Sequence, residues 1–364
     1  MTFYQELQLN QAGSKNYVAT FKKPKEKFLH ILIFIFKVLL NLAFCSAVII
    51  VLGMVFGVEN SIAGLVVVLG ISTFRFTDLD IHATHSVYGI SLIFLILSAG
   101  PKAANLAPTG CDLLINFICI LLIVIIGCHN VNWFNHSILI LSYLLLYGYD
   151  VSGVSYINRL GCLALGAILT SLILYRNRRK KQFKYGFKIL FTDFKLSDAR
   201  SRWQIKIALC VSCAVFFAAL MGITKPIWAG IAAMSVTVPQ GDIKPRVESR
   251  IRANVIGGIV FIIAFLIVPE GYVNYLSMLG GIAAGFCARY EGQTAWNSFS
   301  ALAVNAAAFG FYNTVLYRVL NNVFGAIFAF AFGKITDRIL LALNGFITKI
   351  KQRKTERKSC DNAN

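Results

Sequence analysis

The segment RIRANVIGG, Arg250–Gly258, places two arginines at the head of a hydrocarbon stretch that continues to Val268. Charge at the start of a membrane helix is costly unless it is paired or lies at the interface. A cation-capable residue followed seven positions later by glycine recurs three times in the chain. The other copies are Arg159–Gly166, Arg318–Gly325 and His82–Gly89. Since seven residues make about two helical turns, we expect both groups of each copy on one helix face.

The composition predicts a protein built around membrane helices. Of 364 residues, 57% are hydrophobic and 14% charged, and the mean hydropathy is +0.68. A soluble domain carries about 25% charged residues. Apolar runs of roughly 18–25 residues recur, and each can cross about 30 Å of hydrocarbon. We therefore predict an all-α polytopic membrane protein with about twelve transmembrane helices in two homologous six-helix halves. The predicted spans are 31–56, 60–76, 82–99, 110–128, 136–150, 156–175, 205–223, 226–239, 251–268, 273–288, 295–311 and 315–345.

The charge distribution predicts the orientation. The net charge is +19, but the basic residues gather in segments next to the predicted spans, as the positive-inside rule requires, so a nucleic-acid partner is not expected. Lys102 and Lys225 are the clear cations of the predicted outer loops. We expect a bacterial cytoplasmic (inner) membrane protein with both termini cytoplasmic. The predicted organisation is an N-terminal tail (1–30), a first membrane half (31–175), a linker (176–204), a second membrane half (205–345) and a basic tail (346–364).

The linker between the halves is rich in Lys and Arg, with aromatic and aliphatic residues interleaved. This pattern fits a basic amphipathic helix on the inner leaflet. It equally fits a positive linker that only fixes the topology.

The recurrence of this arginine- or histidine-to-glycine motif at the start of four predicted spans predicts internal repeats. Trp228 lies 22 residues before Arg250, and Trp296 lies 22 residues before Arg318. The repeating unit is then three spans, used four times, and successive units point in opposite directions. Such nested inverted repeats are common in secondary transporters.

The second half resembles a known family. The stretch KPIWAGIAAMSVTVPQGDIKPRVESRIRANVIGG (225–258) is similar to the signature region of the fusaric acid resistance and aromatic acid exporter family. The matching residues are Pro226, Trp228, Ala229, Arg250, Ile251 and Gly257; Ala253 and Asn254 stand where Gly and Thr are usual. The resemblance is clear over about 203–345 and faint over 30–175. It implies export of aromatic or other organic anions, often driven by protons and often with a periplasmic adaptor.

Six residues are candidates for substrate binding. Arg318, Arg250 and Arg159 offer a planar match to a carboxylate, and a helix N-terminus would add partial positive charge. The alternative is that each arginine reaches the interface or pairs with Asp150 or Glu248. Trp228 and Trp296 are candidates for stacking on an aromatic substrate, or for the interfacial aromatic belt. Asn305 lies mid-span among small residues, where a polar amide needs a partner.

Five residues are candidates for proton coupling. His82 and His85 follow Asp78 and Asp80 in RFTDLDIHATH (75–85), and Glu248 precedes Arg250. Histidine titrates near neutral pH, and carboxylates tune it. The alternatives are a solvated loop, a zinc site at the histidines, and charge balancing or a gating network at Glu248. We expect no metal.

The chain lacks GxxxxGK[ST] and any spacing typical of a catalytic triad or metalloenzyme, so we expect no cofactor and no enzymatic activity. The favoured interpretation is a secondary exporter of hydrophobic organic anions. An organic-anion channel and a non-transporting membrane scaffold or assembly subunit stay open as alternatives. The expected partners are a small organic anion and the lipid bilayer; a periplasmic adaptor and a second copy of the chain stay open.

Overall fold

The computed structural model describes the backbone of residues 1–361 and the side chains of residues 1–339, apart from Glu270, Asn274 and Ala307. Every regular element in that range is helical, which confirms the all-α prediction. The α-helices are α1 (Phe3–Leu7), α2 (Gln11–Thr20), α3 (Pro24–Phe56), α4 (Ser61–Phe74), α5 (Ala83–Leu106), α6 (Cys111–Gly127), α7 (Asn135–Gly148), α8 (Gly153–Arg178), α9 (Ile189–Thr192), α10 (Ala199–Leu220), α11 (Ile227–Val236), α12 (Ile243–Ile267), α13 (Leu276–Phe286), α14 (Tyr290–Phe309) and α15 (Phe311–Asp361). Short 3₁₀ turns cover Val58–Asn60, Val131–Trp133 and Glu270–Tyr275.

The number of membrane crossings differs from the prediction. Each of the twelve predicted spans contains an α-helix, but among the described residues six helices are long and apolar enough to cross a membrane, not twelve. These six are α3, α5, α8, α10, α12 and the Phe311–Ile339 part of α15. The protein is thus a multi-pass membrane protein with about six candidate crossing helices.

The remaining predicted spans are shortened by turns or interrupted by polar residues. The helix α11 has 10 residues and α13 has 11, or about 15 Å of rise, which is half the hydrocarbon thickness. The helix α14 is 20 residues long but carries Glu291, Gln293, Asn297 and Asn305 among its apolar residues. The spans were predicted from the hydropathy of the sequence alone. The ends of the helices depend instead on local turns, such as the 3₁₀ segment that precedes α13.

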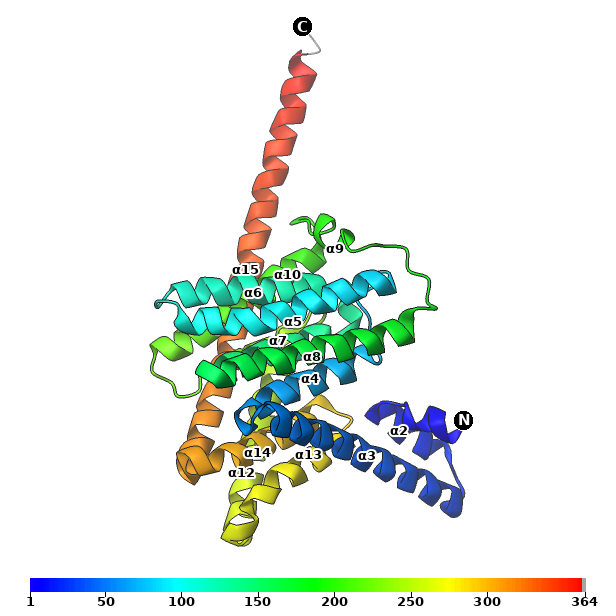
Figure 1. Ribbon diagram of the computed structural model, residues 1–364. Coiled ribbons are helices and arrows are strands. Elements are labelled where there is room, and N and C mark those ends of the chain that lie inside the picture. Colours follow the sequence, from blue (N-terminus) through cyan, green and yellow to red (C-terminus); the bar gives the residue numbers. More distant parts are fainter. Residues whose placement is uncertain (362–364) are drawn as a thin grey trace.

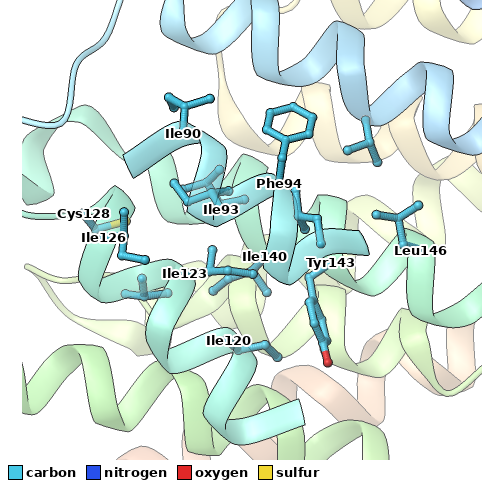
Figure 2. Close-up of a cluster of buried hydrophobic side chains, with 14 of the residues drawn as sticks. Ile90, Ile93, Phe94, Ile120, Ile123, Ile126, Cys128, Ile140, Tyr143 and Leu146 are labelled. Carbon is cyan, nitrogen blue, oxygen red and sulfur yellow. The ribbon is translucent and has the colours of Figure 1, made fainter. Parts of the chain in front are cut away.

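The largest buried cluster is centred on the first half, where it involves α5, α6 and α7, and it extends to residues of α10 and α11 (Figure 2). Ile90, Ile93, Ile120, Ile123 and Ile140 have no exposed surface there. The Tyr143 hydroxyl donates to Asn116 Oδ1 at 2.8 Å, so the amide in α6 has the partner that burial requires. Packing and such interhelical hydrogen bonds hold membrane helices together, because lipid tails are as apolar as the helix faces.

Glycines bring helices of the second half into backbone contact. A Cβ on Gly257 of α12 would collide with the carbonyl oxygen of Ala295 in α14. A Cβ on Gly325 of α15 would collide with the carbonyl oxygen of Ala229 in α11. The helix α15 then continues as one long helix, and its C-terminal end extends beyond the other helices (Figure 1).

The linker is not the long amphipathic helix that its composition fits. Between α8 and α10 the chain forms turns and the four-residue helix α9. The linker instead forms hydrogen bonds with the start of α5: the His82 amide donates to Tyr185 O at 2.9 Å, and the Phe187 amide donates to His85 Nδ1 at 3.3 Å.

Candidate anion-binding site

Two arginines of the second half are buried inside membrane helices. Arg250 of α12 and Arg318 of α15 each expose 6% of their surface. Both lie about two turns beyond the first residue of their helix, past Ile243 and Phe311 respectively. The partial positive charge of a helix N-terminus falls off within the first turn, so the expectation that it acts at these arginines is wrong.

The Arg250 guanidinium is held by an amide of the facing helix. Its Nε and Nη2 donate to Asn322 Oδ1 at 3.1 and 2.9 Å. The Asn322 amide in turn donates to Arg318 O at 2.8 Å, one turn earlier in α15. A double hydrogen bond from a cation fixes the guanidinium plane more firmly than a single one does. Neither carboxylate that the sequence offered forms an ion pair with these arginines: Asp150 pairs with Lys102 at 2.9 Å and acts on Arg159 only at longer range, and Glu248 is exposed.

Asn254 occupies the corresponding position on α12. It lies four residues after Arg250, and its amide donates to Arg250 O at 2.8 Å, as Asn322 does to Arg318 O. Arg250 meets Asn322, and Gly258 lies nearest to Val315, so α12 and α15 cross in opposite directions. This register sets Asn254 at the level of Arg318. Asn254 Oδ1 is nevertheless buried without a hydrogen-bond partner.

Arg318 has an aromatic neighbour and, among the described residues, no acidic partner. Its Cζ lies 5.0 Å from the centroid of the Trp228 ring, and its Nε is 3.4 Å from Ser298 Oγ. It is also close enough to Arg250 and Tyr149 to interact with both electrostatically. No carboxylate within the described part of the chain forms an ion pair with Arg159, Arg250 or Arg318. Two like charges therefore share a low-dielectric site, which favours the entry of an anion.

A third arginine is connected to this region through Tyr149. Arg159 of α8 donates from Nε to Asn60 Oδ1 at 3.1 Å and from Nη1 to Tyr149 O at 2.8 Å. The Tyr149 hydroxyl donates to Asn305 Oδ1 at 3.2 Å, which joins the first half to α14. Lys225 Nζ lies 4.3 Å from the Tyr149 ring centroid, and partial burial lowers the pKa of this lysine.

The two tryptophan candidates have different surroundings. Trp228 is 3% exposed and lies beside Arg318, whereas Trp296 packs against Phe299 at 5.4 Å between ring centroids. Trp296 and Gly257 line a separate cavity of about 210 Å³ between α12 and α14. Of the two, Trp228 is the one placed at the arginine pair.

The proton-coupling candidates before and at the start of α5 make their described contacts with the linker and with His129, rather than with Arg159, Arg250 or Arg318. Asp78 is 1% exposed and contacts Lys181 Nζ at 2.9 Å and Arg178 Nε at 3.6 Å. Asp80 accepts from His129 Nδ1 at 3.1 Å. His85 Nδ1 accepts a hydrogen bond from the Phe187 amide, and His82 immediately precedes the first residue of α5. The described residues contain no cluster of three or more His, Cys, Asp or Glu that could hold a metal ion.

Several residues at the site were not among the sequence candidates. Asn322, Ser298, Tyr149 and Asn60 contact the arginines, and they lie 10 to 99 residues from their partners in the chain. One signal was available for Asn322: Arg250-x₃-Asn254-x₂-Gly257 and Arg318-x₃-Asn322-x₂-Gly325 share a pattern more specific than arginine and glycine alone.

Comparison with known proteins agrees with the resemblance. Residues 213–332 match the family model described as fusaric acid resistance protein-like, which covers about a third of the chain, including Arg250 and Arg318. No curated protein and no solved structure matches the chain. Over the matched residues the family points to a non-enzymatic membrane protein.

Proposed function

We propose that this chain, which carries a fusaric acid resistance protein-like domain at residues 213–332, is a secondary transporter that exports organic anions with an aromatic or apolar body. The observation that carries the proposal is the pair of buried arginines, Arg250 and Arg318, with Trp228 at 5.0 Å and no carboxylate in ion-pair contact among the described residues. The proposed location is the bacterial cytoplasmic membrane, with both termini cytoplasmic.

An anion in this site would offset an unfavourable arrangement of charge. Burying an unpaired ion costs several kcal/mol even after the surroundings relax. Arg250 compensates in part through Asn322, whereas Arg318 makes a single long hydrogen bond to Ser298. A carboxylate offers two oxygens to a guanidinium, and the Trp228 face gives an aromatic body a surface for stacking. The same features predict weak binding of a neutral analogue, because it would leave both charges uncompensated.

The crossing of α12 and α15 supports an exchange mechanism. We infer that the second half consists of two inverted three-helix units, α10–α12 and α13–α15, consistent with the paired contacts Gly257–Ala295 and Gly325–Ala229. Under this arrangement Arg250–Asn322 and Arg318–Asn254 are equivalent pairs. The first is formed, while Asn254 Oδ1 has no partner. In the opposite state of the transporter the second pair would form and the first would open.

Protons are the driving force we propose, since the sequence has no nucleotide-binding motif. Asp78 is engaged with the linker and Asp80 with His129, which leaves Glu248, exposed on α12 two residues before Arg250, as the candidate on an arginine-bearing helix. Its position connects protonation to the helix that we expect to move.

Flux into liposomes tests the proposal. The purified protein is reconstituted in proteoliposomes, and movement of 4-nitrobenzoate is followed under an imposed pH gradient and, separately, an imposed membrane potential. We expect saturable 4-nitrobenzoate flux that depends on the pH gradient. The neutral 4-nitrobenzamide should cross no faster with the protein than in protein-free liposomes. Flux that follows the potential alone would support a channel instead. No flux of any organic acid, together with a stable protein partner in pulldowns, would support the scaffold alternative.

A further inference from the structure

A second cavity lies between the N-terminal segment, α3, α13 and the α4–α5 loop. Its volume is about 760 Å³. This size falls within the range of about 300–1,000 Å³ that is usual for small-molecule sites. It shares no lining residue with the arginine site, and its floor is formed by Val38, Leu42, Gly281 and Gly285.

The floor is closed because α3 and α13 approach closely. A Cβ on Gly285 would come within 2.7 Å of Val38 Cγ1, and the Phe34 and Phe286 rings meet edge to face at 5.5 Å. The side chains at this contact are apolar, so the floor would accommodate the apolar body of a ligand.

The N-terminal segment forms the roof and is anchored to α3 by two charged contacts. Glu6 Oε2 lies 2.9 Å from His30 Nδ1, and Lys37 Nζ donates to Leu9 O at 3.0 Å and to Ser14 Oγ. Glu6 and Ser14 are 4% and 2% exposed, which shows that this segment packs against α3. It contributes Gln8, Asn10 and Gln11 to the lining.

The charges of the lining are all positive. Lys37 and Arg75 line the cavity, and none of its lining residues is acidic. Lys37 is 6% exposed within an apolar membrane helix. An ammonium group has three donors: two of them bond the N-terminal segment, and the ammonium also lies 4.9 Å from the centroid of the Phe34 ring. The Arg75 guanidinium lies 5.1 Å from the Phe76 ring centroid, and Trp133 also lines the cavity.

We propose that this cavity binds a small organic anion, with its anionic group between Lys37 and Arg75 and its apolar body against Val38, Leu42 and Trp133. The lining supplies two cations and no acid, and Glu6, which lies near Lys37 outside the lining, pairs with His30, so the cavity favours a negative group. Four carboxamide side chains supply further donors, and the glycines of α13 leave room for the body. The inference concerns binding at a place separate from Arg318, so it stands or falls independently of transport.

Equilibrium dialysis and Trp133 fluorescence test the proposal on the full-length protein in a non-ionic detergent. We expect 4-nitrobenzoate to bind and to quench the emission that the Trp133→Phe variant lacks, while 4-nitrobenzamide does neither. Arg75→Gln should weaken binding about tenfold, the loss of one charge-assisted hydrogen bond. The matched control is Arg176→Gln, which replaces an exposed arginine outside the lining and should bind as the unmodified protein does.

Lys37→Met gives a second test, since it removes the charge but keeps the length of the side chain. Because this substitution also removes the contacts to Leu9 and Ser14, its result is compared with that of Arg75→Gln, which leaves those contacts intact. Equal affinity of Arg75→Gln, Arg176→Gln and the unmodified protein would overturn the proposal. Quenching by added phosphatidylglycerol without any by 4-nitrobenzoate would also overturn it and assign the cavity to lipid. An Arg318→Gln variant that retains Trp133 quenching separates this site from the transport site.

Discussion

Arg250 donates two hydrogen bonds to Asn322 Oδ1, at 3.1 and 2.9 Å, whereas Asn254, in the equivalent position on α12, has a buried Oδ1 with no partner. The two asparagines are otherwise alike, because each donates to the carbonyl of the arginine four residues before it. One arginine–asparagine pair of the crossing is thus formed and the other is open. This inequality is the structural basis of the exchange that we propose for transport.

The asparagine pair provides the first prediction. Asn322→Ala should lower the free energy of unfolding by about 1.5–3 kcal/mol, since it leaves the buried Arg250 guanidinium without its acceptor. Asn254→Ala should cost less, because its Oδ1 has no bond to lose. Both substitutions should nevertheless impair 4-nitrobenzoate flux. Thermal unfolding and proteoliposome flux measure the two effects; full activity of Asn254→Ala would contradict the exchange.

The glycine contacts provide the second prediction. Gly325→Ala should destabilise the protein by about 1–3 kcal/mol, because the added Cβ meets the Ala229 backbone, which cannot move without shifting α11. The matched control is Gly271→Ala, where a Cβ meets nothing within 4 Å. Thermal unfolding in detergent compares them. Equal melting temperatures for the two variants would show that α11 and α15 are not in backbone contact.

Asp78 provides the third prediction. Asp78→Asn should loosen the linker by removing its ion pairs with Lys181 and Arg178, and trypsin should then cleave faster near Lys180 and Lys184. Asp198→Asn is the control, since its carboxylate is 44% exposed and pairs with Arg200 within the same region. We expect flux to change little in either variant. Loss of flux with an unchanged cleavage rate would return Asp78 to the proton-coupling candidates.

Hydropathy located the helical segments well but not their lengths. The run at residues 273–288 is mostly apolar, yet its first residues form a 3₁₀ turn and α13 occupies Leu276–Phe286. A hydropathy average over a window cannot distinguish a turn from a helix, because a turn within the membrane can be as apolar as a helix when neighbouring protein supplies its hydrogen bonds. Helices shortened in this way, together with the polar residues of α14, reduce the twelve expected crossings to six candidate helices among the described residues.

The site was predictable in part. The spacing of Arg250 and Arg318 to glycine singled out both arginines, and the tryptophan before each motif singled out Trp228 and Trp296 alike. Their partners followed only from the fold, since Asn322 lies 72 residues from Arg250 and Ser298 lies 20 from Arg318. In the sequence, Asp78, Asp80 and His85 resembled a proton relay. In the structure, His85 instead accepts a hydrogen bond from the linker residue Phe187, which lies 102 residues away in the chain.

The most direct measurement of the central claim compares Arg318→Gln with Arg252→Gln in proteoliposomes containing equal amounts of folded protein. Arg252 is a fair control because it is exposed on α12 and pairs with Glu291 at 3.2 Å, away from Trp228. If Arg318 holds the anion, its substitution should reduce 4-nitrobenzoate flux at least tenfold, which corresponds to about 1.4 kcal/mol, while Arg252→Gln keeps the flux of the unmodified protein. Equal flux for both variants would contradict the account.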